Sequence, residues 1–424
     1  MTVESLFTQA LGLADPWFVE SLELDPDGKQ LRIRIDFLRG AKFHHQDDEQ
    51  NAPSLHPVHD TVERQWQHLN FFQYHTVITA RLPRIKLPDG SVRNALVPWA
   101  RPQSGFTLMM EAFLLSLARC MSVAEAARLT GVSQDRIWHL IRSRVTEAWK
   151  EQDWQGVKRI GVDETSTRRG HNYATAFCEI QGQETERGHG AAKVTRLLFF
   201  TPGKDKETFA RFVDELKARQ VEPAQIEEIA MDMSPAFISA ASEHFPTSVL
   251  SFDRFHVMKL CGQAIEEVRK QVVAQEGKLP KGAMWALRGN PENLKAHQLE
   301  LRAKLSKEHK TLARALALRD YLSDTWNYAT KEAAEEHLRS VLSWFRRSRL
   351  APFVKLGKTL KKHWDGIIGY YKNFTTSAAM ESLNSRLQEA RARARGYRLF
   401  ANFQAIAYWI AGGFKINTNY TVTH

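Results

Sequence analysis

The sequence has few cysteines and no long apolar run. Its 424 residues include only three cysteines, which lie far apart at Cys120, Cys178 and Cys261. Isolated cysteines in an odd number support neither a disulfide framework nor a four-cysteine zinc site. No segment reaches the ~18 consecutive apolar residues of a membrane span, and the N-terminus has acids where a secretion signal has basic residues. We therefore expect a folded intracellular protein with several domains.

Positive charge is in excess, and it is concentrated near the C-terminus. The formal net charge is +11. Between His337 and Phe400 there are fourteen Lys and Arg residues and three acids, so this window carries as much net charge as the whole chain. Interleaved aromatic residues add a capacity to stack on nucleic-acid bases; they are Trp344, Phe345, Trp364, Tyr370 and Tyr371. The alternative is a set of solvated helix faces over aromatic core residues.

Residues 1–104 are predicted to form a small β-rich module. Alternating apolar and polar residues in LRIRIDFL (31–38) and HTVITARLP (75–83) are typical of half-buried strands. Six histidines in this region show no ligand-pair spacing and have no thiolate companion, which favours surface or hydrogen-bonded roles over a zinc site. These are His44, His45, His56, His59, His68 and His75.

Residues 105–155 show the pattern of a helix-turn-helix DNA-binding domain. Gly131 marks a turn between two helical segments, and Ser133 is placed to cap the second of them. Apolar residues recur at helical spacing in this second helix, which leaves a polar face free to enter a DNA groove. We expect DNA contacts from Ser133, Gln134, Arg136, His139 and Arg142. The alternative is an ordinary helical hairpin inside a core.

From residue 156 onward, the order of predicted elements matches an RNase H-like core. Strand patterns in VKRIGVDE, HNYATAFCEI and KVTRLLFFT precede an amphipathic helix, DKETFARFVDELKARQ, and a fourth strand, IEEIAMDMS. The first part of this core spans 156–256, a helical insertion domain spans 257–372, and the final part of the core spans 373–424. The predicted fold class is α/β plus α, a mixed sheet with a helical insertion that follows the two N-terminal modules.

Three acidic residues of this core belong to different predicted elements. Asp163 and Asp232 end two strands, and Glu381 lies near the start of the last helix. Three converging carboxylates can hold two Mg²⁺ or Mn²⁺ ions, which neutralise charge on the attacking and leaving oxygens of a phosphodiester. Each acid alone has an ordinary explanation as a strand terminus or a helix cap. Their joint occurrence favours a catalytic metal site, from which strand alternation excludes the neighbouring Glu164.

The helix that contains Glu381 has two distinct faces. An apolar stripe at three- and four-residue spacing is expected to pack on the sheet; it consists of Met380, Leu383, Leu387, Ala390 and Ala394. Polar and basic residues on another face and beyond the helix end are expected to contact DNA. They are Asn384, Gln388, Arg391, Arg393, Arg395 and Arg398, of which the arginines would hold phosphates.

Several motifs, in this order along the chain, resemble those of DDE transposases of bacterial insertion sequences, specifically the ISL-three family. They are IGVDETS, MDMSPAF, FDRFHVMKL and MESLNSRLQEARARARGYR. The resemblance covers most of the chain and implies that Asp163, Asp232 and Glu381 are the catalytic triad. It further implies binding to terminal inverted repeats, cleavage of the ends, and joining of their 3′-hydroxyls to target DNA. It also implies a homodimer or higher homo-oligomer on paired ends, in the cytoplasm of a bacterium at its nucleoid.

The chain departs from that family at two places. Family members usually carry a zinc-binding cysteine module near the N-terminus, whereas FHHQDD and RIKLPDGS contain no cysteine here. A zinc site would therefore lack thiolate ligands, and hydrophobic packing would have to hold this module together. The family's Thr-Asn-Gly ahead of the catalytic acid is replaced by Thr376-Ser377-Ala378. Asp253 and His256, in the FDRFHV motif, would lie near the active site or DNA, or have a structural role.

Two other functions remain open at this point. One is an RNase H-like nuclease that cuts DNA without joining it, because the same metal site would serve both reactions. The other is a transposase-derived protein that binds DNA without catalysis, which would have no use for all three acids.

Overall fold

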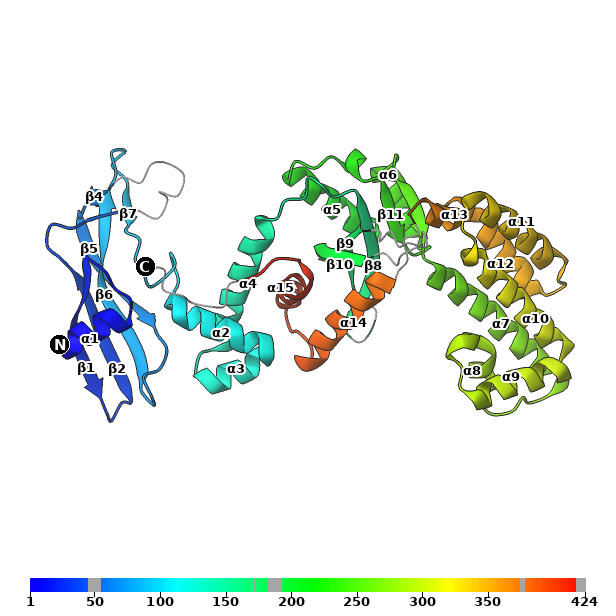
Figure 1. The fold of residues 1–424 in the computed structure, drawn as a ribbon, viewed down its shortest axis with the longest axis horizontal. Coiled ribbons are helices and arrows are strands. Elements are labelled where there is room, and N and C mark those ends of the chain that lie inside the picture. The colour runs from blue at the N-terminus through cyan, green and yellow to red at the C-terminus, as the bar shows by residue number, and fades with distance from the viewer. Residues whose placement is uncertain (45–54, 169, 171, 182–192, 374–377, 417–424) are drawn as a thin grey trace. The chain divides into compact units, whose positions relative to one another are not determined.

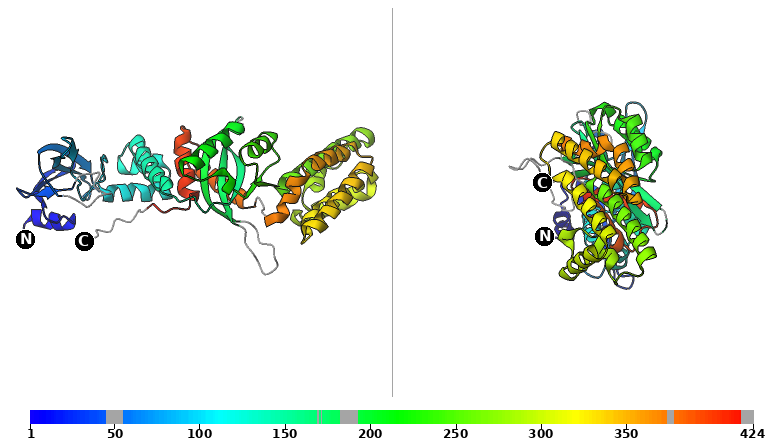
Figure 2. Two further views of the ribbon diagram at one scale, coloured as in Figure 1. Left: turned by 90° about the horizontal axis from the view of Figure 1, so that it is seen from above. Right: turned by 90° about the vertical axis from the view of Figure 1, so that its right-hand side faces the viewer.

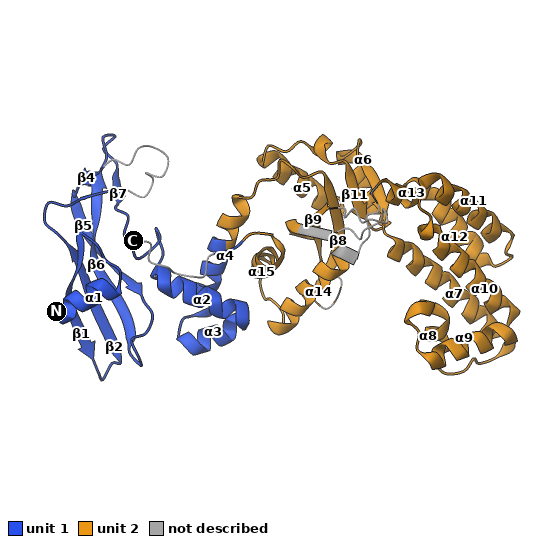
Figure 3. Cartoon of the chain, viewed as in Figure 1, with its two compact units in different colours: residues 1–144, 415–424 blue, residues 145–414 orange. Residues whose placement is uncertain are grey.

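The computed structural model describes the whole chain (Figure 1) except for residues 45–54, 169, 171, 182–192, 374–377 and 417–424. The chain divides into two compact units, one of residues 1–144 and 415–424 and one of residues 145–414 (Figure 3). Within the described ranges, no helix is long and apolar enough to cross a membrane. The five segments predicted from the sequence have other boundaries than these two units and stay a prediction.

The first unit begins with a short helix, α1 (Val3–Ala10), and a five-stranded sheet. Strands β1, β2, β6 and β5 lie in that order, and β7 pairs with β6. The pair β2 and β6 is parallel, and the other pairs are antiparallel. The strands of the unit are β1 (Trp17–Asp25), β2 (Gln30–Phe37), β3 (Lys42–Phe43), β4 (His56–Pro57), β5 (Asp60–Gln67), β6 (His75–Lys86) and β7 (Val92–Asn94). The two strands predicted at 31–38 and 75–83 are confirmed as β2 and β6.

Aromatic packing forms the centre of this N-terminal core. The ring of Trp99 makes edge-to-face contacts with Trp17 at 4.8 Å and with Trp66 at 5.5 Å, and all three side chains are buried. Among the histidines of the region, His68 places Nδ1 2.8 Å from the hydroxyl of Thr107. His45 lies outside the described residues. Large apolar side chains therefore provide a core here that does not depend on cysteine ligands.

The helix-turn-helix consists of α2 (Leu108–Cys120), α3 (Val123–Thr130) and α4 (Gln134–Lys150). Gly131 ends α3 with φ of 70°, a left-handed conformation that glycine adopts without steric cost. The hydroxyl of Ser133 accepts the N–H of Arg136 at 3.4 Å, which confirms the predicted cap. Ile137 and Ile141 are fully buried on one face of α4, as their spacing predicted. The residues of α4 after 144 belong to the second unit.

The sheet of the second unit has the strand order β10-β9-β8-β11-β12. The strands β10, β9 and β8 are antiparallel to their neighbours, whereas β8, β11 and β12 run parallel. The first five elements follow one another as predicted: β8 (Arg159–Arg168), β9 (Asn172–Gln181), β10 (Lys193–Pro202), α5 (Lys206–Ala218) and β11 (Glu228–Met231). The helix α6 (Pro235–His244) and the strand β12 (Val249–Phe252) come after them.

Helices cover both faces of this sheet. On one face, Phe177 of β9 stacks on Phe212 of α5, with ring centroids 4.3 Å apart. On the other face lie α14 (Ala378–Arg393) and α15 (Phe400–Ala411). A Cβ atom at Gly161 of β8 would lie 2.8 Å from the sulfur of Met380. The side chains of Met380 and Ile180 thus fill the space beside Gly161, and α14 packs closely on β8 there.

Where the helical insertion is predicted, the chain forms an uninterrupted series of helices, which Figure 2 shows side by side as a bundle. It joins the sheet where α13 packs on β12. Its helices are α7 (Arg254–Glu276), α8 (Ala283–Arg288), α9 (Ala296–Glu308), α10 (Lys310–Ser323), α11 (Lys331–Arg347), α12 (Ala351–Lys362) and α13 (Trp364–Asn373). The chain then enters α14, whose predicted apolar stripe is buried at Met380, Leu383, Leu387 and Ala390. Thr376 and Ser377 lie outside the described residues.

Candidate functional site

Three aspartates stand at one level of three adjacent parallel strands. Gly161 of β8 pairs with Ala230 of β11, and Ala230 pairs with Ser251 of β12. Two residues further along each strand, this register brings Asp163, Asp232 and Asp253 to the same edge of the sheet. Adjacent strands are about 4.8 Å apart, so the three backbones are close neighbours. The carboxyl ends of parallel strands are a common position for active sites in α/β proteins.

Asp163 is held by two hydrogen bonds. Its Oδ1 accepts the backbone N–H of Glu164 at 2.8 Å, and its Oδ2 accepts the side-chain amide of Asn384 at 2.6 Å. Asn384 lies on α14, so this bond links the helix directly to the strand that carries Asp163. Asp232, which follows β11, accepts the backbone N–H of Ser234 at 2.9 Å through its Oδ1.

The charges of this cluster act on one another. Burial raises the pKa of Asp163 to about 6, and the carboxylates of Asp232 and Asp253 raise it as well, against the opposing effects of the Glu164 N–H and of His256. Burial and the charge of Asp232 also raise the pKa of Glu164. Glu164, which strand alternation placed on the opposite face, is therefore part of the electrostatic environment of the site.

The Asp253–His256 pair lies at the start of α7. Asp253 accepts the N–H of Phe255 at 2.8 Å through Oδ1, and its Oδ2 lies 3.1 Å from Nδ1 of His256. This hydrogen bond is the main cause of a raised pKa at His256, and the carboxylates of Asp232 and Asp163 contribute to it. The FDRFHV motif thus combines a structural role, the capping of α7, with a position beside the acidic cluster.

Glu381 lies in the first turn of α14 and is exposed. It precedes Asn384 by three residues, which is about 4.5 Å along a helix axis and places both on one face. Among the described residues, no three His, Cys, Asp or Glu side chains are near enough to one another to hold a metal ion. The assignment of Asp163, Asp232 and Glu381 as metal ligands therefore stays a prediction.

The donor atoms of the cluster nevertheless suit a hard cation. Carboxylate and amide oxygens are the ligands that Mg²⁺ and Mn²⁺ prefer. Oδ1 of Asn384 is buried and accepts no hydrogen bond from any residue that the structure describes. A buried amide oxygen without a partner is costly, and a bound cation or its water would satisfy it.

The polar face of α14 follows β8 from Asp163 toward the end of the strand. Gln388 donates to the hydroxyl of Thr165 at 2.7 Å and to the carbonyl of Ser166 at 3.1 Å. Arg391 donates to the same carbonyl at 2.7 Å. Asn384, Gln388 and Arg391, which were predicted to contact DNA, are thus joined to β8 by hydrogen bonds. Their DNA contacts stay a prediction.

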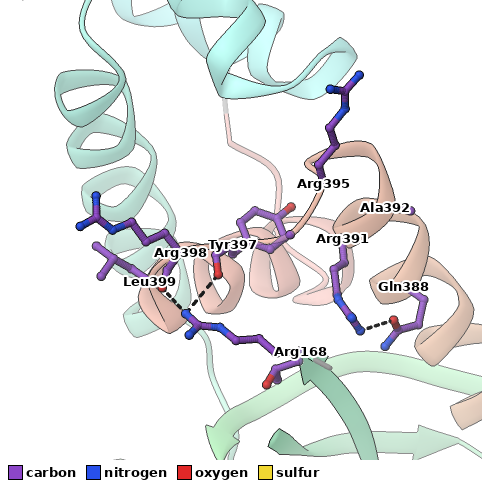
Figure 4. Close-up of a pocket in the computed structure, with 10 residues that line it drawn as sticks. Arg168, Gln388, Arg391, Ala392, Arg395, Tyr397, Arg398 and Leu399 are labelled. Carbon is purple, nitrogen blue, oxygen red and sulfur yellow. Dashed lines mark hydrogen bonds between the residues drawn. The ribbon is translucent and has the colours of Figure 1, made fainter. Parts of the chain in front are cut away.

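Arg395 and Arg398 lie beyond the end of α14, beside a pocket that Arg391 also lines (Figure 4). Arg395 and Arg398 are exposed. The guanidinium of Arg168, from the end of β8, donates to the carbonyls of Tyr397 and Arg398. The sequence did not single out Arg168 or Tyr397, because their proximity depends on a contact between segments about 230 residues apart.

The predicted DNA-reading residues of α4 differ in their availability. Ser133, Gln134 and His139 are exposed, and Arg142 is half-buried. Arg136 is also exposed, but it donates to the side-chain oxygen of Gln67 at 2.9 Å, and its guanidinium lies 4.1 Å from the ring centroid of Phe106. Arg136 therefore ties α4 to the sheet of the first unit, and a role in DNA reading would require it to give up these contacts.

Aromatic residues of the basic window belong largely to the core of the insertion. Phe345 is fully buried and Tyr371 is buried, so neither ring is free to stack on a base. Trp344 is 37% exposed and packs against Tyr321 with ring centroids 5.1 Å apart. The alternative interpretation, cations on solvated faces above aromatic core residues, describes this segment better than base stacking does.

Comparison with known proteins agrees with this organisation. Residues 160–407 match the transposase domain of the ISL3 family, and residues 95–150 match the helix-turn-helix domain of transposase family ISL3. The chain belongs to the ISL3 family of transposases. It is 25% identical over 367 residues to the transposase for insertion sequence element IS1557 of Mycobacterium tuberculosis, covering 79% of this chain and 78% of the relative. It is 24% identical over 360 residues to the transposase for insertion sequence element IS1001 of Bordetella parapertussis, covering 82% of this chain and 85% of the relative.

Proposed function

We propose that this transposase cuts the ends of its insertion sequence and joins the exposed 3′-hydroxyls to target DNA, with an RNase H-like core as its catalytic domain. The observation that carries the proposal is the shared level of Asp163 and Asp232 on adjacent parallel strands, together with the hydrogen bond from Asn384 to Asp163. That bond supports the proposal because it links α14, the helix that also carries Glu381, to the strand of Asp163. The order of three antiparallel strands followed by two parallel ones supports the RNase H-like assignment.

Asp163, Asp232 and Glu381 would hold two Mg²⁺ or Mn²⁺ ions. Such ions, when bound, supply charge neutralisation at the attacking and leaving oxygens of the phosphodiester. Asn384 orients Oδ2 of Asp163 through its amide and presents a buried amide oxygen to the same region. The backbone N–H of Glu164 fixes the other carboxylate oxygen, so Asp163 is held in one orientation before DNA binds.

DNA contacts are proposed for two regions. In the helix-turn-helix, the terminal inverted repeats would contact Ser133, Gln134 and His139, and Arg136 and Arg142 are two further proposed contacts. In the second unit, backbone phosphates would lie along α14 and its end, on Asn384, Gln388, Arg391, Arg393, Arg395 and Arg398. Because two ends of the insertion sequence must be cut, we also propose a homodimer or higher homo-oligomer in the bacterial cytoplasm.

An assay with labelled terminal-repeat DNA, a plasmid target and Mg²⁺ tests the proposal. Joined products are expected. Cleavage without joining would identify a nuclease, and a mobility shift without cleavage would identify a DNA-binding protein; either result contradicts the proposal.

Asp163→Asn tests the assignment of the site. It should abolish cleavage and leave binding to the ends nearly unchanged, because only a metal ligand is lost. Asp214→Asn is a matched control, since Asp214 is exposed in the middle of α5. Equal loss of cleavage and end binding in Asp163→Asn would argue against a purely catalytic role.

A further inference from the structure

A pocket of about 1050 Å³ lies where β8 ends and the chain turns from α14 into α15 (Figure 4). Among the described residues that line it there are four arginines and no acid; the arginines are Arg168, Arg391, Arg395 and Arg398. We propose that this pocket holds a phosphodiester of the DNA end, about five nucleotides from the phosphate that is cut. The inference rests on the proposed function and adds a specific path for the DNA strand.

The walls of the pocket are built before any DNA binds. Arg168 donates to the carbonyl of Tyr397 at 3.4 Å and to that of Arg398, which holds the turn against the end of β8. The hydroxyl of Tyr397 donates to the carbonyl of Ala390 at 3.2 Å, and its ring stacks on Phe403 of α15. Contacts from a strand and from two helices thus fix the shape of the turn.

Two of the four arginines have no other role in the structure. The guanidinium groups of Arg168 and Arg391 bind backbone carbonyls. Those of Arg395 and Arg398 are exposed, and neither forms a hydrogen bond or an ion pair with any residue that the structure describes. A pocket lined by cations without acidic partners favours the binding of a polyanion. Guanidinium groups match the geometry of a phosphate.

Arg395 also occupies a conformation that is unfavourable for its residue type. Its φ is 55°, and Gly396 follows with φ of 95°. Glycine is the usual residue in such a left-handed conformation after the end of a helix. A bulky residue pays a steric cost in this left-handed region. Such strain is often found at binding sites. An arginine at this position is consistent with a function of its side chain rather than with a preference of the fold.

Two independent measures give the distance from the cutting site. From Asp163 to Arg168 there are five residues of strand, which span about 16 Å. From Asn384 to Arg393 at the end of α14 there are nine residues that advance about 14 Å along the helix, and Arg395 follows two residues later in the turn. Phosphates of one strand of a duplex are spaced about 3.4 Å along its axis. If Asp163 contacts the scissile phosphate, the pocket therefore lies about five nucleotides away from it.

The first experiment compares Arg395→Gly with Arg349→Gly. Arg349 is an exposed arginine in the turn between α11 and α12 and has φ of 57°, so the same substitution relieves the same backbone strain outside the pocket. Both variants should unfold at or above the temperature of the wild type. Binding to a duplex that carries the terminal repeat is measured by fluorescence anisotropy at several salt concentrations.

Only Arg395→Gly should weaken binding, by roughly tenfold, and it should reduce the slope of log K against log salt by about 0.9, the value for one phosphate contact. An equal loss in Arg349→Gly would show a general effect of net charge and would overturn the proposal. Inorganic phosphate is tested as a separate ligand. Saturable binding of phosphate that Arg395→Gly removes would identify a free-phosphate site instead of a site for DNA.

The second experiment locates the phosphate. Single methylphosphonate linkages, which remove one charge each, are placed at successive positions from the cut, and binding is measured in the Asp163→Asn background so that no cleavage occurs. The wild-type pocket should be sensitive near the fifth nucleotide, and Arg395→Gly should be insensitive at that position alone. Sensitivity that is identical in both proteins at every position would refute the inference. Because binding is the readout, this failure is distinct from an absence of cleavage, which would refute the proposed function.

Discussion

Ionisation of Asp163 is predicted to destabilise the folded chain before any metal binds. Burial raises the pKa of Asp163 from 3.8 to about 6. Folding therefore strengthens proton binding by Asp163. The loss of unfolding free energy that its ionisation causes is absent below pH 3.8, grows as the pH rises to about 6, and is constant above. The difference in pKa corresponds to about 3 kcal/mol of unfolding free energy at pH 7.5 and to less than about 1 kcal/mol at pH 4.

Asp163→Asn removes this cost because an amide does not ionise. The new amide N–H group would face the amide of Asn384, which can rotate and offer its unpartnered Oδ1 as an acceptor. The variant should therefore stabilise the unit of residues 145–414 by about 3 kcal/mol at pH 7.5 and by little at pH 4. Urea unfolding at a series of pH values, followed by a signal from that unit, measures the difference.

Asp214→Asn, at an exposed position of α5, should change the unfolding free energy by no more than about 0.5 kcal/mol at either pH. Added Mn²⁺ should stabilise the wild type more than Asp163→Asn, since the substitution removes one of the three proposed carboxylate ligands. A destabilised Asp163→Asn at pH 7.5, or a gain that does not vary with pH, would refute the argument that burial makes this carboxylate costly.

Two further predictions concern packing and pH. Gly161→Ala should lower the unfolding free energy by about 1–3 kcal/mol and reduce cleavage, because a Cβ would meet Met380 at 2.8 Å and Ile180 at 2.6 Å and push α14 from β8. A variant with the cleavage rate and the urea midpoint of the wild type would contradict this prediction. Burial lowers the pKa of His68 from 6.5 to about 4. Unfolding therefore allows this histidine to take up a proton, and the first unit should lose about 2 kcal/mol of unfolding free energy between pH 7.5 and pH 5. In urea unfolding, His68→Gln should lose less stability over this range, and an equal loss would contradict the role of His68.

The sequence predicted several helices and strands in both units because each depends on a local pattern. Alternation in LRIRIDFL gave a strand, the spacing of Ile137 and Ile141 gave the buried face of α4, and Ser133 gave its cap. The apolar stripe of α14 was equally visible, since it repeats at helical spacing. These features are set by neighbours within a few residues, which is why one sequence is enough to find them.

Side-chain partners could not be predicted in the same way. Arg136 was assigned to DNA from its place on a polar helix face, yet Gln67 and Phe106 engage its guanidinium. Arg168 was not recognised at all, although it holds the turn that presents Arg395. Each of these contacts joins segments that are tens to hundreds of residues apart, and no periodicity in the sequence records such distances.

The sequence by itself determined the kind of chain this is: a transposase with a helix-turn-helix, a sheet whose strands end in acids, and a basic helix near the C-terminus. Tertiary structure decided which of those residues meet. The register of β8, β11 and β12 sets Asp163, Asp232 and Asp253 at one level, and the packing of α14 on β8 beside Gly161 brings Asn384 within hydrogen-bond distance of Asp163. Local propensity is encoded by adjacent residues, whereas strand register and helix docking follow from the packing of the whole sheet.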